Sequence, residues 1–300
     1  MKQFLDKLFY NKLLTSFLLL SPLLIWLGVV YLGSLFTLLL QSFFSLDSFS
    51  GKIIYEFSFE NYTQLTRESN IDIFIRTILM SSIVTIVSVI IAFPIAYYMS
   101  FLAKSNWKPI LYLGIMFPLW SSYMVKVYAW KLILAKEGIL NWCLERIGLQ
   151  AVLELILELP YIGGSSLSFS YIGIFLVFLY IWLPFMILPI YSALERIPKN
   201  LVDASMDLGA TPLYTLFKVI LPLSIPGVVA GSIFTFSLTM GDYIIPTIIG
   251  NSSYFIGMAV YTLQGTTGNI PLAASFSVVP IVVMGIYLRI AKKLGAFDAI

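Results

Sequence analysis

The sequence predicts an all-α integral membrane protein, on three observations. Of its 300 residues, 59% are hydrophobic and only 11% are charged, and the mean hydropathy is +0.94, which is a composition typical of membrane proteins. Six windows of about twenty apolar residues, each long enough to cross a bilayer as a helix, follow one another along the chain. The most polar long break in the second half lies between the fourth and fifth windows.

The six windows predict six transmembrane helices in one domain, 1–300. The first follows three lysines and is too long for a signal-peptide core, so we expect it to be retained as a span. The third contains Lys126 and Lys131 toward its end, so its apolar stretch is expected to stop near Tyr128. The windows cover 13–40, 74–102, 109–134, 170–192, 226–249 and 272–291.

The distribution of charge predicts how the spans are oriented. With the N-terminus inside, the inner segments hold eleven basic and five acidic residues, and the outer segments hold seven basic and ten acidic ones. Basic residues concentrate on the cytoplasmic side of membrane proteins. Both termini are therefore expected to be cytoplasmic. The outer segment 135–169 reads as short amphipathic helices on the membrane surface, ended by Pro160 and the pair Gly163-Gly164.

The polar break, 199–222, predicts a rigid helix-turn-helix that serves as a docking surface. Asn200 or Asp203 is a candidate cap for its first helix, and Gly209 suits the left-handed position that ends it. Thr211 and Pro212 supply a cap and a first-turn proline for the second helix. The alternative is a solvated loop in which the glycine is only a helix stop.

The sequence contains no pattern of residues that is typical of an enzyme active site. The chain has no histidine and a single cysteine, Cys143, which excludes histidine-based catalysis, histidine metal sites and intrachain disulfides. The one Gly-Lys pair, Gly51-Lys52, lacks the upstream glycine and the following Ser or Thr of a phosphate-binding loop. Any ATP hydrolysis is therefore expected on another chain. We expect no catalytic residue, no metal site and no nucleic-acid partner.

A solute pathway is predicted near the outer end of the fifth window, where Met240–Pro246 combines an acid, a glycine and a proline in a candidate gate. A carboxylate is costly at membrane depth, so Asp242 should face a cavity or a cation, unless it only solvates a helix end. Aromatic faces bind amine cations, although such rings also form membrane-interface belts. The pathway candidates are Asp242, Tyr243, Trp120, Tyr123, Tyr128 and Trp182.

The polar break resembles the cytoplasmic loop by which permease subunits of ATP-binding-cassette importers bind their ATPase. The resemblance rests on an acid and two small residues, a glycine six positions after the acid, and a later Val-x-Leu-Pro: Asp203, Ala204, Ser205, Gly209, Val219, Leu221 and Pro222. Asp replaces the family's usual Glu, and Ser replaces its second Ala. The implied ATPase-coupling residues are Asp203, Ala204, Ser205, Asp207, Gly209, Ala210, Thr211 and Pro212.

Four further segments, 118–120, 136–141, 183–191 and 241–246, are similar to the B-type subunit of the spermidine/putrescine permease, and the likeness extends over about 60–290. The resemblance implies a type I importer permease with a coupling helix between its fourth and fifth spans, in the bacterial cytoplasmic (inner) membrane. It also implies a C-type second permease subunit, an ATPase dimer that holds ATP and Mg²⁺, and an external solute-binding protein. Segment 269–274 lacks the acid and tryptophan that often precede the family's proline, which leaves the solute open.

Three alternatives remain beside a polyamine importer. The same architecture could carry an opine, a phosphonate, thiamine or ferric iron. A secondary transporter or channel would need no ATPase. A membrane-embedded enzyme would need clustered acids or a metal site within the spans, and the sequence offers only isolated acids.

Overall fold

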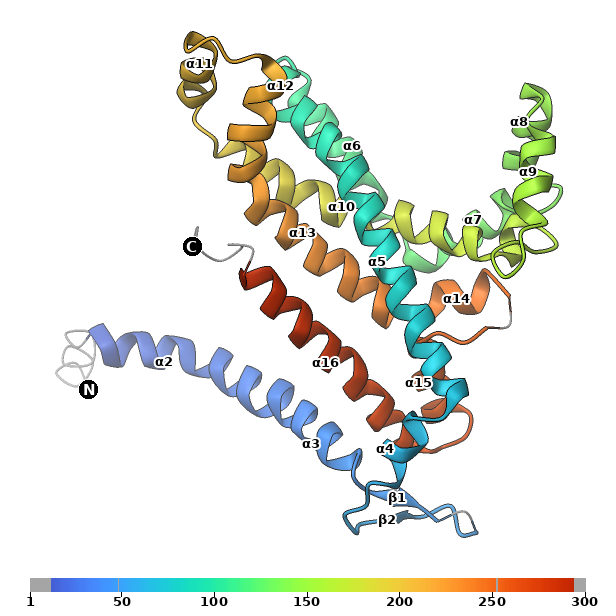
Figure 1. The fold of residues 1–300 in the computed structure, drawn as a ribbon. Coiled ribbons are helices and arrows are strands. Elements are labelled where there is room, and N and C mark those ends of the chain that lie inside the picture. Colours follow the sequence, from blue (N-terminus) through green and yellow to red (C-terminus); the bar gives the residue numbers. More distant parts are fainter. Residues whose placement is uncertain (1–11, 48, 252, 294–300) are drawn as a thin grey trace. The chain divides into compact units, whose positions relative to one another are not determined.

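The computed structural model describes residues 12–47, 49–251 and 253–293, and it is almost entirely helical (Figure 1). Two units are described separately below: 1–66 with 263–278, and 67–262 with 279–300. Lys2, Asp6, Lys7 and Asp298, which enter the charge count, lie outside the described residues, so the sidedness of the termini stays a prediction. The continuous helices long and apolar enough to span a membrane are Thr15–Gln41, Glu68–Leu102, Tyr171–Glu195, Pro212–Gly241 and Ile270–Lys293.

The first unit is built on one long helix whose apolar side chains are exposed. It runs through α2 (Lys12–Ile25), a π-helical stretch (Trp26–Leu32) and α3 (Gly33–Gln41). None of the most apolar window within Thr15–Gln41 is buried. In an apolar helix of this kind, such a surface is stable only when lipid or another chain covers it.

A short loop structure follows this helix and is tied back to its end. The Asn61 amide donates to Ser42 O at 3.2 Å and to Phe44 O at 2.6 Å, and Tyr62 OH shares a hydrogen bond of 2.6 Å with Ser42 Oγ. The loop contains a two-residue antiparallel pairing, which adds a small β element to the all-α prediction. Its elements are β1 (Ser45–Leu46), β2 (Ile53–Ile54) and α4 (Glu60–Leu65).

The centre of the second unit is a group of three helices, α5 (Glu68–Tyr97), α10 (Tyr171–Glu195) and α13 (Leu221–Gly241), which lie against one another (Figure 1). Glycine allows α13 to approach α10 closely. A Cβ added at Gly231 would lie 2.8 Å from Met186 Sδ, and one added at Gly227 would lie 2.5 Å from the Cβ of Ala193. Small residues four positions apart are a common packing device of membrane helices.

The third predicted span is broken. The structure divides 109–134 into α6 (Lys108–Trp120) and α7 (Tyr123–Ile133), which meet at an angle of 94°. The last turn of α6 contains Pro118, the backbone of Ser121 is extended, and Lys126 Nζ donates to Pro118 O at 2.8 Å. The ammonium group thus compensates the negative end of α6 at the break. The segment is a bent pair rather than one straight helix, which corrects the prediction.

The fifth span also differs from its predicted bounds, 226–249. The span begins at Pro212, continues through a π-helical stretch, η4 (Leu216–Ile220), and ends at Gly241. Asp242 is extended, with φ −74° and ψ 129°, and a separate short helix, α14 (Ile244–Ile248), follows it. The apolar character of the sequence continues past Gly241 although the helix does not.

The segment 135–169 contains the short helices predicted from its amphipathic pattern, α8 (Ile139–Ile147) and α9 (Gln150–Leu157). Gly148 separates them with φ +78°. Leu140, Leu144 and Leu157 pack against the buried core, and Leu153 belongs to it. That these helices lie on the membrane surface remains a prediction. The other elements are η2 (Tyr98–Leu102), η3 (Leu167–Phe169), α11 (Lys199–Asp207), α12 (Pro212–Thr215), α15 (Ile256–Gly265) and α16 (Ile270–Lys293).

Candidate functional site

The loop between α10 and α13 folds as two short helices joined at a glycine turn (Figure 1). The amide of Ala210 donates to Ser205 O at 3.1 Å, and the amide of Gly209 donates to Met206 O at 2.9 Å. Gly209 has φ +83°. This pair of bonds around a left-handed residue is the Schellman ending of a helix, and the prediction for Gly209 is confirmed.

The second helix of the loop is capped as predicted, whereas the first is not. Thr211 Oγ1 accepts a hydrogen bond from the amide of Tyr214 at 3.3 Å, and Pro212 is the first helical residue. Helix α11 begins at Lys199 after an extended Pro198, with no side-chain cap. Asn200 and Asp203 therefore lie inside the helix, and the prediction that either one caps it is wrong.

The two short helices are linked side by side and present apolar groups outward. Ser205 Oγ and Thr215 Oγ1 are 2.9 Å apart, which joins α11 to α12. Leu208 is 89% exposed at the turn, and the carboxylates of Asp203 and Asp207 are exposed as well. A group of exposed apolar side chains rimmed by polar residues is typical of a protein-binding surface. We call 199–217 the docking loop; its exposed large apolar residues are Leu201, Met206, Leu208, Leu213, Tyr214 and Phe217.

Asp242 joins three elements at the end of α13. Its Oδ1 accepts hydrogen bonds from the amides of Ile244 at 2.7 Å and Ile245 at 3.1 Å, which caps α14. Its Oδ2 accepts a hydrogen bond from the hydroxyl of Tyr123, at the start of α7. The carboxylate, which is partly buried, thus connects α13 and α14 to the broken third span. Its remaining lone pairs leave capacity to accept a bond from a ligand.

An aromatic group continues from Asp242 onto α10. The rings of Tyr123 and Trp182 stack with centroids 5.8 Å apart, and Phe185 meets Trp182 edge-on at 5.7 Å. Within the described residues, the indole Nε1 of Trp182 is buried without a hydrogen-bond partner. The structure therefore brings together three of the predicted pathway residues, Asp242, Tyr123 and Trp182.

Of the other three predicted pathway residues, Tyr243 lies next to Asp242 but stacks on another ring, and Trp120 and Tyr128 are largely exposed. Tyr243 stacks on Tyr261 with centroids 4.7 Å apart, and Trp120 and Tyr128 are 68% and 55% exposed. Lys126 is engaged at the helix break, and Lys131 lies over the ring of Phe169 at 6.0 Å. Both lysines make these contacts rather than contacts with Asp242.

Two residues of α15 complete this region, and the sequence reasoning missed them. A Cβ added at Gly257 would lie 2.6 Å from Asp242 O, so α15 approaches the backbone closely at this point. Tyr261 stands four residues after Gly257 and stacks on Tyr243. Residues four positions apart lie on the same face of a helix. The spacing of Gly257 and Tyr261 was therefore the signal in the sequence that one face of this helix could pack here.

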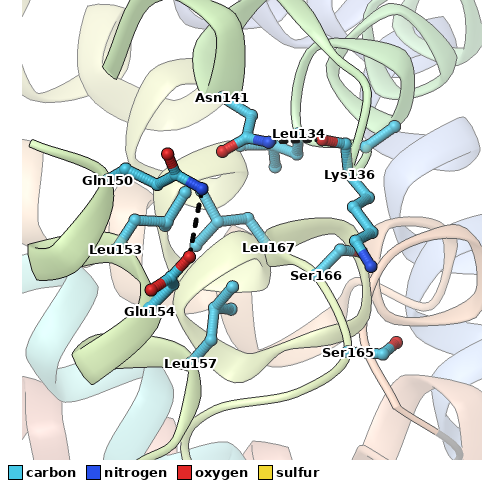
Figure 2. A pocket seen from close by; sticks show the side chains of 11 residues that line it. Leu134, Lys136, Asn141, Gln150, Leu153, Glu154, Leu157, Ser165, Ser166 and Leu167 are labelled. Carbon is cyan, nitrogen blue, oxygen red and sulfur yellow. Dashed lines mark hydrogen bonds between the residues drawn. The ribbon is translucent and has the colours of Figure 1, made fainter. Parts of the chain in front are cut away.

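A separate cavity lies beside α8 and α9. It has a volume of about 110 Å³ and is lined by carboxylate, amide, hydroxyl and apolar groups. Gln150 Nε2 donates to Glu154 Oε1 at 3.0 Å on one wall, and Lys136 extends toward Ser165 and Ser166 on the other (Figure 2). None of the predicted pathway residues is among its described lining residues, so the cavity is distinct from the group around Asp242.

The order of spans, the broken third segment and the docking loop between α10 and α13 define the class. This is the type I permease fold of ATP-binding-cassette importers. The sequence profile described as "Binding-protein-dependent transport system inner membrane component" matches residues 73–295. The chain belongs to that family.

Two curated relatives illustrate the range of similarity within the family. The inner membrane ABC transporter permease protein YdcU of Escherichia coli is 52% identical over 275 residues, which cover 92% of this chain and 88% of that protein. The spermidine/putrescine transport system permease protein PotB of Haemophilus influenzae is 29% identical over 262 residues, which cover 86% of this chain and 87% of that protein. Both are named as permease subunits of transport systems.

Two solved structures share the fold. A chain of the bacterial alginate ABC transporter, in complex with an alginate pentasaccharide-bound periplasmic protein, aligns with a TM-score of 0.70 at 14% identity, covering 95% of this chain and 94% of that one. A chain of the MetNI methionine ABC transporter aligns with a TM-score of 0.51 at 17% identity, and the alignment covers 76% of this chain and 99% of that one. At such identities the likeness concerns the fold alone.

Proposed function

We propose that this permease subunit takes up polyamines, spermidine and putrescine, delivered by an external solute-binding protein. The importer class follows from the family. The solute is supported by the resemblance to polyamine permeases and by the named function of PotB at 29% identity. YdcU, at 52% identity, is named for no solute, so the solute requires its own experiment.

The geometry that favours a cationic solute is the group of Asp242, Tyr123 and Trp182. A carboxylate with free lone pairs beside two stacked aromatic rings suits an amine, because ammonium groups bind both carboxylates and aromatic faces. Among the described acids, Asp242 and Asp47 are less exposed than all the others. A carboxylate within the membrane protein, close to a span end, is a natural contact for a passing cation.

We further propose that the docking loop binds the ATPase subunit, whose ATP hydrolysis drives transport. Its rigid turn and exposed apolar side chains fit an ATPase subunit, and the ATP and Mg²⁺ would be held by that partner. In the assembly we propose, a C-type permease subunit completes the pore, an ATPase dimer binds on the cytoplasmic side, and both termini of this chain are cytoplasmic. The inward-directed cycle is alternating access driven by closure of the ATPase dimer.

Uptake of labelled spermidine by cells with and without the chain tests the solute. The strain must lack other polyamine importers, and unlabelled putrescine, phosphonate, thiamine and ferric iron serve as competitors. We expect deletion to abolish uptake and putrescine alone to compete. Unchanged uptake after deletion would overturn the polyamine proposal and leave the importer class standing with another cargo.

Asp242→Asn refines the same experiment. Asparagine keeps the oxygen that accepts from Ile244 and Ile245 but removes the charge. Loss of one charge contact to a bound cation is expected to reduce spermidine uptake about tenfold, or roughly 1.4 kcal/mol, at an unchanged membrane level. Wild-type uptake in this variant would mean that Asp242 has only a structural role, as the cap of α14 and the acceptor for Tyr123.

A further inference from the structure

One lysine joins the ends of three spans. Lys108, the first residue of α6, forms an ion pair with Glu195, the last residue of α10, with Nζ and Oε1 2.6 Å apart. The same Nζ donates to Ser100 O at 2.9 Å, in η2 at the end of the α5 span. Among the described residues the other ion pair, Asp72 with Arg76, lies within α5 alone. Lys108, Glu195 and Ser100 together are called the Lys108 junction.

The hydrogen bond to Ser100 satisfies a group that the helix leaves open. The last carbonyls of a helix have no following amide to bind, and η2 ends with a bond from Ala103 N to Tyr98 O. Lysine side chains near a helix C-terminus bind such carbonyls and are stabilised by the helix dipole. Lys108 therefore anchors α5 through its backbone and α10 through a carboxylate.

The junction is the end of an ordered interface between α6 and α10. One turn further in on each helix, the rings of Tyr112 and Tyr191 lie with their centroids 6.1 Å apart. The positions are four after Lys108 and four before Glu195, as expected for two antiparallel helices in contact. The side chains of Lys108 and Glu195 are only 26% and 40% exposed, so solvent screens this pair less than a fully exposed one.

Glu195 is joined to the docking loop by a link of three residues. Only Arg196, Ile197 and Pro198 separate it from the start of α11. Ile197 is 7% exposed and Pro198 is fixed in an extended conformation, so this link is short and anchored. A displacement of α11 is therefore transmitted first to the end of α10, where Lys108 is bound.

We propose that Lys108 is a positioning residue that passes movement of the docking loop from α10 to α5 and to the broken third span. The ion pair carries the movement to α6, and the bond to Ser100 carries it to α5. This inference rests on the proposed coupling to an ATPase, but it does not depend on which solute is carried. Without Lys108, the ATPase would still bind and hydrolyse ATP, and the far end of α6 would no longer respond.

The test follows the far end of α6 in the complete complex with its ATPase. Trp120 is the last residue of α6 and is 68% exposed. The substitution Trp120→Cys, made in a Cys143→Ser background, places a single thiol there. The rate at which this thiol is labelled is measured with and without ATP. Lys108→Met is compared with Lys108→Arg, which retains the charge and the donors. Asp72→Asn, which breaks the ion pair inside α5, is the matched control.

We expect ATP to change the labelling rate in the parent, in Lys108→Arg and in Asp72→Asn. In Lys108→Met the effect of ATP on the labelling rate should be about tenfold smaller, which is within the range of ordinary coupling energies. The amount of bound ATPase and its rate of ATP hydrolysis should be unchanged. An unaltered ATP response in Lys108→Met would overturn the role of Lys108 alone. No ATP response in the parent would overturn the coupling through the docking loop, and with it this inference, whatever the result of spermidine uptake.

Discussion

At the scale of single residues, the docking loop depends on the backbone of Gly209. Its φ of +83° is costly for any residue with a side chain, by about 1–2 kcal/mol. Apart from the adjoining residues of the chain, no heavy atom lies within 4 Å of an added Cβ, so the cost of a substitution comes from the backbone and not from a clash. The turn should therefore be altered without damage to the packed spans.

Gly209→Val is expected to reduce ATP-driven uptake several-fold while the protein remains in the membrane at its normal level. The matched control is Gly285→Val in α16, where an added side chain also enters open space but no left-handed backbone is required. Uptake and membrane level measured together separate coupling from folding. Equal uptake in the Gly209 variant and the wild type would contradict the role of the turn.

The residues of the docking loop show what the sequence can predict. Gly209 and Thr211 act through bonds to neighbours within five residues along the chain, so their roles follow from local pattern. The start of α11 was missed by two residues or more because Pro198 supplies an extended residue without a side-chain cap. The stacking of Tyr243 on Tyr261 joins separate segments, and no local rule predicts such a contact.

At the scale of elements, the broken third span is the main departure from the sequence prediction. Its signals were present, since Pro118 precedes two serines, Ser121 and Ser122, and a lysine follows. An average over about twenty residues hides such a break because the flanking residues are apolar. Lys126, expected only to shorten the span, instead binds the carbonyl that the break exposes.

Lys126→Met is expected to destabilise the protein by about 1–3 kcal/mol, because Pro118 O would lose the charged one of its two donors and keep only the hydroxyl of Ser121, at 3.0 Å. The loss would appear as a lower midpoint of thermal unfolding in detergent. Lys131→Met is the control, since that lysine contributes an aromatic contact of about 0.5–1 kcal/mol. A Lys126 variant as stable as the wild type would show that the bend does not depend on this bond.

At the scale of the whole molecule, the second unit connects its two candidate functional regions, the docking loop and the group around Asp242, through α10 and α13. The docking loop follows the end of α10 and precedes α13, and α13 ends at Gly241, next to Asp242. The close approach at Gly227 and Gly231 holds the two helices together along this path. A partner that moves the docking loop would therefore act on the group around Asp242 through packed helices.

The most direct test of this account is retention of the ATPase subunit by the permease during purification from membranes, for the wild type and for Leu208→Glu. Leu208 is 89% exposed at the turn of the docking loop, so the charge should leave the fold intact and oppose binding of an apolar partner surface. We expect the wild type to retain the ATPase and the variant to retain at least about tenfold less. Equal retention, with both proteins at the same membrane level, would contradict the assignment of this loop as the ATPase-binding surface.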